Sequence, residues 1–477
     1  MADSRLAAQR LAAEQQVYAR PLHALVARSP VTVSQDLSVA LAARRMRAEG
    51  VGSLVVVDGE GKPIGIFTSH DLVRAVAAEG SAKPLSEWMT ANPASLPGHA
   101  LAYEAALAMS ARSIRHILVE EGGRLAGVVS ERDLFALQRL ALGQLVMGIR
   151  AATDIAALSR LAGEVRGLGA VLVGQGVAAE QLTHFLSVLN DRVSQRAIEI
   201  VRRRHDLERL RWCWLAFGSE GRFEQTLATD QDNGLVFAVE DAPADAVRPR
   251  LLAFAREVNE ALGACGFPLC KGNVMASNPA LCLTLEEWRS KMVGWIEAAL
   301  PKALLDAAIC FDFRPLHGDA TLAHELRDWM AARVRATPLF LRHMTEAALQ
   351  GGVALNRWGR FAVDKEGRLD LKLGGTRVFV DCARIWALAM GVAQTNTAER
   401  LRIAAPHLGM SETEVAGAVD AFYLLQQLRL KQWGGATGET PNRLAPGALN
   451  RMTRAALLEA LRTGRDLQRR LALDYQL

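Results

Sequence analysis

The sequence predicts a multidomain α/β protein that ends in a mainly helical region. Three observations lead to this prediction: an internal repeat near the start, a strand–turn–strand segment with an Asp-x-Asp pair, and broad apolar stripes at helical spacing from about residue 320 onward. The chain has 477 residues. At roughly 100–200 residues per domain, this length predicts two to four domains.

The repeat relates residues 29–76 to residues 92–137. Each unit begins with a short extended entry and continues into a helix whose apolar face follows i, i+4, i+7 spacing, as at Val39, Ala43 and Met46. Two apolar strands and a closing helix follow in both units. We therefore expect two copies of one β/α unit.

The second strand of each unit ends in Gly-φ-φ-[Ser/Thr]-x-x-Asp, at Gly65–Asp71 and Gly127–Asp133. With this motif, residues 21–140 resemble a pair of CBS domains, also called a Bateman module. The resemblance implies that the hydroxyl and the carboxylate hold the ribose of an adenine nucleotide and that Arg132 meets a phosphate. The residues that it places at the ligand are Thr68, Asp71, Ser130, Arg132 and Asp133. The same pairs would also serve as capping boxes at helix starts, with no ligand, and Arg132 would then be a solvated side chain.

The most informative segment reads WCWLAFGSEGRFEQTLATDQDNGLVFAV, residues 212–239. We expect a buried strand, a turn at Gly218 and Ser219, and a second strand from about Asp230. On a strand, Asp230 and Asp232 would point to the same face. Two adjacent carboxylates repel unless a cation intervenes, and Mg²⁺ combines few carboxylates with substrate phosphates. Gly218 would let the backbone approach a phosphate, to which Ser219 adds a hydroxyl and an amide. The alternative is an acidic, solvated turn before a strand.

The Gly-Ser turn followed by Asp-x-Asp resembles the nucleotidyltransferases of polymerase-β type. The longer run GSEGRFEQTLATDQDN is similar to a bacterial family of nucleotidyltransferases found beside CBS pairs and related to PII uridylyltransferase and glutamine-synthetase adenylyltransferase. The resemblance continues through KGNVMASNP, FDFRPLHGD and LKLGGTRVFVDCARIWAL, and so spans most of residues 142–475. It implies a third metal-binding carboxylate, for which we expect Asp312. A salt bridge from Asp312 to an arginine is the alternative, and Asp306 or Glu286 would then be substitutes.

Three further residues are candidates for nucleotide contacts. Arg222 follows the Gly-Ser turn and is expected either at the triphosphate or in an ion pair with a neighbouring Glu. Lys271 and Asn273 lie in a polar loop and are expected either at the base or phosphate or in a plain turn.

The predicted organisation has five parts. From about residue 320 the chain is expected to be helical, with a short hairpin over Arg360–Val380. The expected parts are an N-terminal helix (1–20), the CBS pair (21–141), a helical connector (142–211), the nucleotidyltransferase-like domain (212–319) and a C-terminal mainly helical domain (320–477).

Charge and cysteine usage point to an ordinary intracellular setting. The formal net charge of +5 is a mild excess that gives only weak support for a nucleic-acid or membrane-surface role, and we expect no nucleic-acid partner. The six cysteines form no C-x-x-C pair, so we expect buried thiols in a reducing compartment. The first residues lack the apolar core of a signal peptide, and no apolar run reaches the ~20 residues of a membrane span. We expect a cytoplasmic protein without a membrane partner.

Together these features predict a Mg²⁺-dependent nucleotidyltransferase that is controlled by adenine nucleotides at the CBS pair. The resemblance implies ATP or UTP as the donor, a regulatory protein as the acceptor and a homodimer. The alternative is a nucleotide-sensing adaptor whose transferase domain is catalytically inactive.

Overall fold

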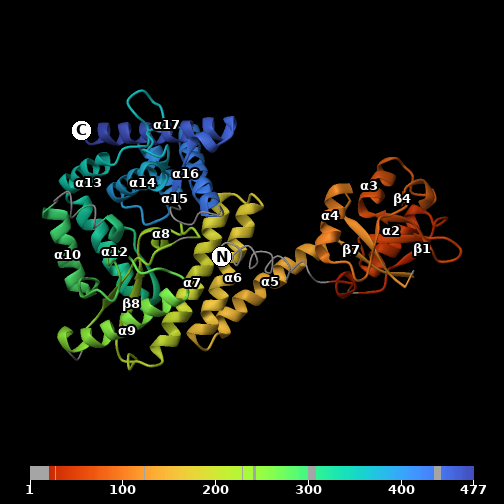
Figure 1. The fold of residues 1–477 in the computed structure, drawn as a ribbon, viewed down its shortest axis with the longest axis horizontal. Coiled ribbons are helices and arrows are strands. Elements are labelled where there is room, and N and C mark those ends of the chain that lie inside the picture. Colours follow the sequence, from red (N-terminus) through yellow and green to blue (C-terminus); the bar gives the residue numbers. More distant parts are fainter. Residues whose placement is uncertain are drawn as a thin grey trace. The chain divides into compact units, whose positions relative to one another are not determined.

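The chain divides into two compact units, Met1–Gln144 and Leu145–Leu477 (Figure 1). The computed structural model describes residues 21–477 except for 27, 113, 123, 228, 240–242, 299–303, 305–307 and 434–441. The helix expected over residues 1–20 lies outside the described residues. The predicted fold class, α/β domains followed by a helical region, is confirmed.

The first unit contains the two repeats. The first repeat consists of β1 (Thr32–Ser34), α2 (Val39–Glu49), β2 (Ser53–Val57), β3 (Pro63–Thr68) and α3 (Ser69–Ala77), and the short β4 (Thr90–Ala91) completes its sheet in the order β1-β2-β3-β4. The second repeat consists of β5 (Ser95–Pro97), α4 (Ala102–Arg112), β6 (His116–Glu121), β7 (Arg124–Ser130) and α5 (Glu131–Ala151), with the sheet order β5-β6-β7.

Alternation along the strands explains how each repeat packs. On β2, Leu54 and Val56 belong to the core beneath α2, whereas Val55 points to the other face. Val55 packs there with Ile66 and with Leu118 of the second repeat. Both faces of these strands are therefore buried, which accounts for their nearly continuous apolar sequence.

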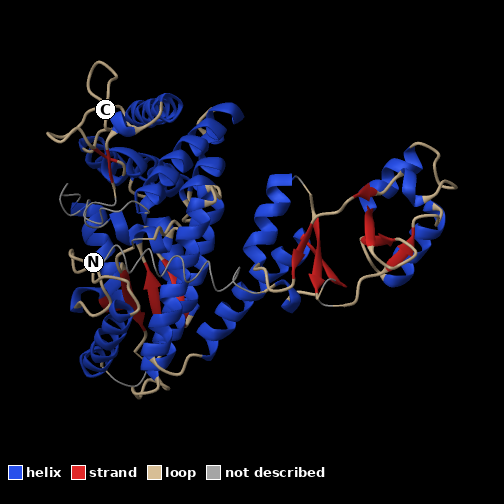
Figure 2. Ribbon diagram, turned by 45° about the vertical axis from the view of Figure 1, so that its right-hand side comes forward, coloured by secondary structure: helices blue, strands red, loops and turns tan. Residues whose placement is uncertain are grey.

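The second unit is built around a four-stranded mixed sheet with the order β10-β9-β8-β11 (Figure 2). Its strands are β8 (Trp212–Ala216), β9 (Asn233–Phe237), β10 (Cys282–Thr284) and β11 (Arg314–Gly318). β8 runs antiparallel to both β9 and β11, and β10 runs parallel to β9. The helices around the sheet are α6 (Ile155–Gly174), α7 (Ala179–Arg202), α9 (Ala244–Ala264), α10 (Leu285–Ala298) and α12 (Ala320–Arg335).

Helices cover both faces of this sheet. Trp212 and Trp214 of β8 pack edge-on against Phe254 of α9 on one face. Cys213 and Leu215, which alternate with them, belong to the core on the α10 and α12 side. Every residue of β8 is buried, as this two-sided cover requires.

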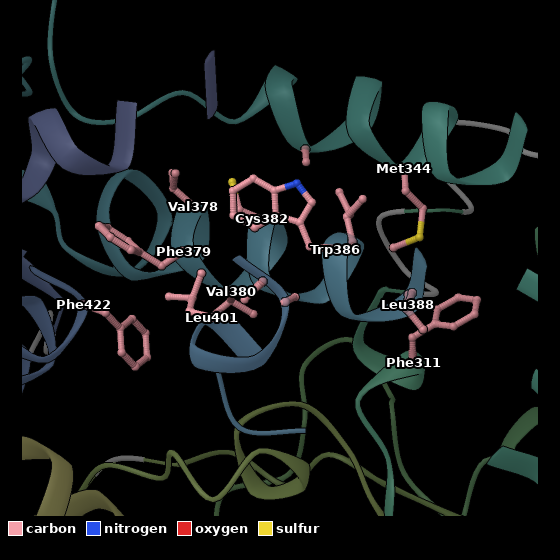
Figure 3. Packing of buried hydrophobic residues seen from close by; sticks show 14 of the residues in the cluster. Phe311, Met344, Val378, Phe379, Val380, Cys382, Trp386, Leu388, Leu401 and Phe422 are labelled. Carbon is pink, nitrogen blue, oxygen red and sulfur yellow. The ribbon is translucent and has the colours of Figure 1, made fainter. Parts of the chain in front are cut away.

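The remaining helices extend the same core. They are α13 (Pro338–Gln350), α14 (Arg377–Met390), α15 (Thr397–His407), α16 (Glu412–Trp433) and α17 (Arg451–Asp474). Figure 3 shows α14 at the centre, where Phe379 and Trp386 pack among side chains of neighbouring elements, including Phe422 of α16 and Phe311. The sheet and the C-terminal helices thus share one hydrophobic core.

The hairpin expected over Arg360–Val380 does not form. The short strand β12 (Leu369–Asp370) pairs instead with β13 (Arg443–Leu444), and a π-helical turn, Lys372–Thr376, leads directly into α14. The strand partner is distant in sequence, so local spacing could not identify it. Among the described residues, no helix is long and apolar enough to span a membrane.

Candidate nucleotide site

The Gly-Ser turn forms a single helical turn, α8 (Gly218–Gly221), at the end of the buried strand β8. Gly218 has a φ of +56°, a conformation that favours glycine. A Cβ on Gly218 would lie 3.0 Å from Oδ2 of Asp232. The backbone N–H of Phe217 also donates to the carbonyl oxygen of Asp232 over 2.9 Å. The start of the turn and the second aspartate of the Asp-x-Asp pair are therefore in direct contact.

The Asp-x-Asp pair lies just before a strand rather than on it, because β9 begins at Asn233 and not near Asp230. The side chains of residues 230–232 nevertheless alternate between the interior and the surface side. The amide of Gln231 is buried and donates to the carbonyl oxygens of Asn259 (2.9 Å) and Phe267 (2.8 Å). Asp230 is exposed and Asp232 is half-buried. Gln231 thus anchors the segment in the interior.

The electrostatic setting of Asp232 suits a cation. Burial raises the pKa of Asp232, and the charge of Asp230 raises it further. The pKa of Asp232 is lowered by a hydrogen bond from the Cys270 thiol and by the charges of Lys372 and Arg222. A bound divalent cation would relieve the repulsion between the two carboxylates. Among the described residues, however, no three His, Cys, Asp or Glu side chains gather into a metal-binding group, so Mg²⁺ would rely on two carboxylates and the phosphates of a substrate.

Asp312, expected as the third carboxylate, occupies a different place. It is completely buried, and Gly221, at the far end of α8 from Gly218, packs against its carbonyl oxygen. Its Oδ1 accepts from Arg384 (3.1 Å) and Arg400 (2.5 Å), and its Oδ2 accepts from Arg384 (2.6 Å) and Arg222 (2.7 Å). Both oxygens are therefore engaged by arginines, which corrects the expectation of a metal ligand in favour of the salt-bridge alternative.

Burial alone would raise the pKa of Asp312, but the three arginines outweigh it and hold the pKa well below its usual range. The carboxylate is thus fully charged at neutral pH. The guanidinium of Arg222, expected at the triphosphate, is also engaged by carboxylates. Its Nε donates to Glu224 over 2.8 Å and its Nη1 donates to Asp312 over 2.7 Å.

These groups form a buried network that joins the sheet to the C-terminal helices. We call it the Asp312 cluster. Its members are Arg222, Glu224, Asp312, Asp381, Arg384 and Arg400. These members are three arginines and three carboxylates, and Asp381 also pairs with half-buried Arg377 over 3.3 Å. Sequence reasoning missed Arg384 and Arg400, although an arginine within an apolar helical run such as CARIWAL is a signal for a buried counter-ion.

The expected loop residues lie in an exposed segment beside the aspartates. Lys271 and Asn273 are both exposed, and Asn273 adopts a left-handed φ of +56°. Cys270, the preceding residue, bonds to Asp232. The segment therefore borders the carboxylates, and the nucleotide contacts of Lys271 and Asn273 stay predictions.

Glu220 on α8 is a second buried carboxylate near the site. Its pKa is raised to about 8, first by burial and then by the charges of Asp191 and Asp232, while Arg314 lowers it. Arg314 lies close by, since its guanidinium donates to the carbonyl oxygen of Glu220 and to Asp191. Glu220 is therefore largely protonated at neutral pH in the absence of a bound cation.

The two repeats of the first unit differ at their Ser/Thr-x-x-Asp pairs. In the first repeat, Oδ2 of Asp71 accepts from the backbone and the hydroxyl of Thr68, and Oδ1 accepts from Arg74 over 3.2 Å. Asp71 is buried. In the second repeat, Oδ2 of Asp133 accepts from the backbone and the hydroxyl of Ser130, and Asp133 is exposed.

Both acids thus bond to the residue that precedes their helix, as the capping alternative expects. These contacts do not test ligand binding, which stays a prediction. The side chain of Arg132 lies outside the described residues.

Family models match three parts of the chain. "Putative nucleotidyltransferase DUF294" matches residues 163–302, "Putative nucleotidyltransferase substrate binding domain" matches residues 338–475, and the CBS domain matches residues 23–78 and 85–139. Asp312 lies between the first two matches.

The curated relatives cover a smaller part of the chain. An uncharacterized 17.7 kDa protein of Acidianus ambivalens is 31% identical over 103 residues, which are 21% of this chain and 63% of that protein. The L-aspartate semialdehyde sulfurtransferase of Methanocaldococcus jannaschii is 28% identical over 114 residues, 24% of this chain and 22% of that enzyme. The chain thus spans less than two thirds of the length of these relatives.

Similar solved structures are CBS-domain proteins. One from Agrobacterium tumefaciens is 34% identical and covers 25% of this chain and 99% of its own, with a TM-score of 0.24. One from Pyrobaculum aerophilum, complexed with AMP, is 24% identical and covers 26% and 99%, with a TM-score of 0.24. From the family matches, the chain belongs to the CBS-pair proteins that carry the DUF294 nucleotidyltransferase domain and its C-terminal substrate-binding domain.

Proposed function

We propose that the chain is a Mg²⁺-dependent nucleotidyltransferase whose reaction takes place at Asp230 and Asp232. The observation that carries this proposal is the contact between Asp232 and the Gly218 turn, which brings a carboxylate pair and a phosphate-accommodating backbone to the same point. The raised pKa of Asp232 supports a cation at this point, because a buried carboxylate beside another carboxylate lacks sufficient positive charge.

In this proposal Asp230 and Asp232 hold Mg²⁺, and Gly218 and Ser219 receive the triphosphate. Bound Mg²⁺ supplies the positive charge that lowers the pKa of the attacking hydroxyl and offsets the charge of the leaving pyrophosphate. The acceptor oxygen forms a bond to the α-phosphorus, the bond from that phosphorus to the pyrophosphate oxygen breaks, and the hydroxyl proton passes to solvent. Lys372, which lowers the pKa of Asp232, adds positive charge from the C-terminal domain.

The acceptor proposed here is a protein hydroxyl, with ATP or UTP as the donor. The similarity to PII uridylyltransferase and glutamine-synthetase adenylyltransferase suggests a tyrosine on a regulatory protein, and this step rests on family analogy. The match of residues 338–475 to a substrate-binding domain supports a docking role for the C-terminal helices.

We further propose that an adenine nucleotide bound to the CBS pair regulates the transferase, and that the protein is a homodimer. We expect the second repeat to bind the adenine nucleotide, because Asp133 is exposed while Asp71 is buried and tied to Arg74. A ribose that approached Asp71 would have to displace Arg74. The effector would act through a difference in its affinity for two conformations of the protein.

The position of Asp312 favours a second candidate function. Among the described residues, no third carboxylate joins Asp230 and Asp232 in a metal-binding group. The domain would then bind a nucleotide and report it to a partner without transferring it. The chain would then be a nucleotide-sensing adaptor.

One experiment separates the two functions. The purified protein is incubated with Mg²⁺, α-labelled ATP or UTP and a lysate of its source cells, beside a double Asp230→Asn, Asp232→Asn variant. A labelled protein band that requires both aspartates supports the transferase. Mg²⁺-dependent nucleotide binding without any labelled band, while a known transferase labels its acceptor in parallel, supports the adaptor.

A further inference from the structure

The far end of the α8 turn is held by the segment that connects α14 to α15. The hydroxyl of Thr395 donates to the carbonyl oxygen of Gly221 over 2.7 Å, and the amide of Asn396 donates to that of Arg222 over 3.1 Å. The backbone N–H of Thr397 donates to Oε1 of Glu224 over 2.6 Å. Three consecutive residues of the C-terminal domain thus bind the last residue of the turn, its C-cap Arg222 and Glu224, which follows them.

The same end of the turn is closely packed from the sheet side. A Cβ on Gly221 would lie 2.0 Å from the carbonyl oxygen of Asp312 and 2.9 Å from that of Ala216. Both obstacles are backbone atoms, which cannot rotate away as a side chain can. Gly221 therefore lies in direct contact with the residue at the centre of the Asp312 cluster.

Arg400 links the two contacts. Its Nη1 donates to Oδ1 of Asp312, and its Nε donates to the carbonyl oxygen of Gln394 over 2.7 Å. The Arg400 side chain, 3% exposed, therefore holds both the Asp312 carboxylate and the segment that carries Thr395. Arg384 fixes Asp312 from α14 through two further bonds.

We propose that the C-terminal domain positions the α8 turn for nucleotide binding, with Thr395, Asn396, Arg384 and Arg400 as positioning residues. The turn has only four residues, Gly218–Gly221. A shift at Gly221 is therefore passed on to Ser219 and to Gly218, which lies against Asp232. This inference rests on the proposed nucleotide site and gives the C-terminal domain a part in that site in addition to substrate docking.

The test is the removal of a single hydroxyl. Thr395→Val keeps the shape of the side chain and loses the bond to Gly221, whereas Thr395→Ser keeps the hydroxyl. Thr463→Val is a matched control, because the Thr463 hydroxyl also donates to a backbone carbonyl, that of Glu459, on the exposed side of α17. Half-buried Thr395 lies outside the apolar core, so the fold should tolerate the valine.

Two quantities are measured: hydrogen exchange of the amides of residues 219–222 without ligand, and the Kd of Mg²⁺-ATP and Mg²⁺-UTP. We expect Thr395→Val to speed the exchange and to weaken Mg²⁺-dependent binding by about fivefold, the effect of one typical hydrogen bond. Thr395→Ser and Thr463→Val should match the wild type in both quantities.

The outcomes distinguish the inference from the proposed function. If the wild type binds Mg²⁺-nucleotide through Asp230 and Asp232 and Thr395→Val binds it equally well, the positioning role is wrong and the proposed function stands. If the wild type shows no binding that depends on these aspartates, the proposed function fails, and the positioning role fails with it. Unchanged exchange in Thr395→Val also contradicts the inference.

Discussion

The Asp312 cluster makes a specific prediction for the substitution Asp312→Asn. If Asp312 were a metal ligand, the variant would keep its fold and lose Mg²⁺-dependent nucleotide binding. The structure predicts a different result, because the carboxylate neutralises arginines in the protein interior. The variant should lose stability first.

The size of the loss follows from the charges that remain. Substitution changes a cluster of three arginines and three carboxylates into one of three arginines and two carboxylates. Arg222 keeps Glu224, and Arg384 keeps Asp381. Among the described residues, Asp312 is the one carboxylate that Arg400 contacts, and burial already lowers the pKa of Arg400. Leaving such a charge unpaired should cost about 3–5 kcal/mol in the free energy of unfolding.

The assay is urea unfolding followed by tryptophan fluorescence. Of the nine tryptophans, all but Trp88 lie in the second unit, so the signal reports on the unit that contains Asp312. The control is Asp319→Asn, since Asp319 forms a partly exposed ion pair with Arg211 and should contribute less than about 1 kcal/mol. An Asp312→Asn variant that unfolds like the wild type but no longer binds Mg²⁺-nucleotide would refute this reasoning and restore Asp312 as a metal ligand.

Three further substitutions test separate contacts. Gly221→Ala should destabilise the second unit by about 1–3 kcal/mol or more in urea unfolding, because its Cβ would overlap the Asp312 carbonyl. The control is Gly417→Ala on α16, which has open space around it and should be neutral or slightly stabilising. Equal effects of the two substitutions would contradict the packing described. Glu220→Gln should gain stability relative to the wild type as the pH rises from about 4.5 to 8. Across this window the carboxyl ionises in the unfolded chain but stays protonated in the folded protein, where its pKa is raised to about 8, so the wild type loses stability; thermal unfolding between pH 5 and 9 checks this sign. In the CBS pair, Asp133→Asn should weaken AMP binding in calorimetry while Asp71→Asn should mainly lower the thermal stability; the reverse pattern would place the ligand in the first repeat.

Local pattern was enough to predict much of the fold. The repeat and the apolar strands are encoded in residues adjacent in sequence, and Leu54, Val56 and Phe67 lie in the core as their pattern predicts. The second strand of the transferase domain was misplaced by three residues. The cause lies at Gln231, whose backbone N–H donates to the carbonyl oxygen of Pro268, outside the sheet, instead of to a strand neighbour. Its side-chain amide is held in the interior by the carbonyl oxygens of Asn259 and Phe267.

Long-range charge pairing could not be predicted in the same way. The partners of Asp312 come from positions 222, 384 and 400, so no spacing rule connects them. The resemblance to the nucleotidyltransferases implied a metal ligand, and only the fold shows that α8 contacts Asp232 at Gly218 and Asp312 at Gly221. The contacts of Thr395 and Asn396 with the turn were missed for the same reason, since no sequence signal links positions 174 residues apart.

The central claim is that a Mg²⁺-dependent nucleotide site is formed by Asp230 and Asp232. The most direct measurement is a thermal-shift panel of ATP, UTP, CTP, GTP, AMP and ADP, with and without Mg²⁺, on the wild type and on the Asp230→Asn, Asp232→Asn variant. A triphosphate at about 100 times its Kd should stabilise the folded wild type by about 2.7 kcal/mol. We predict a Mg²⁺-dependent shift for one triphosphate that disappears in the variant. A panel in which every shift is independent of Mg²⁺, or persists in the variant, would contradict the claim.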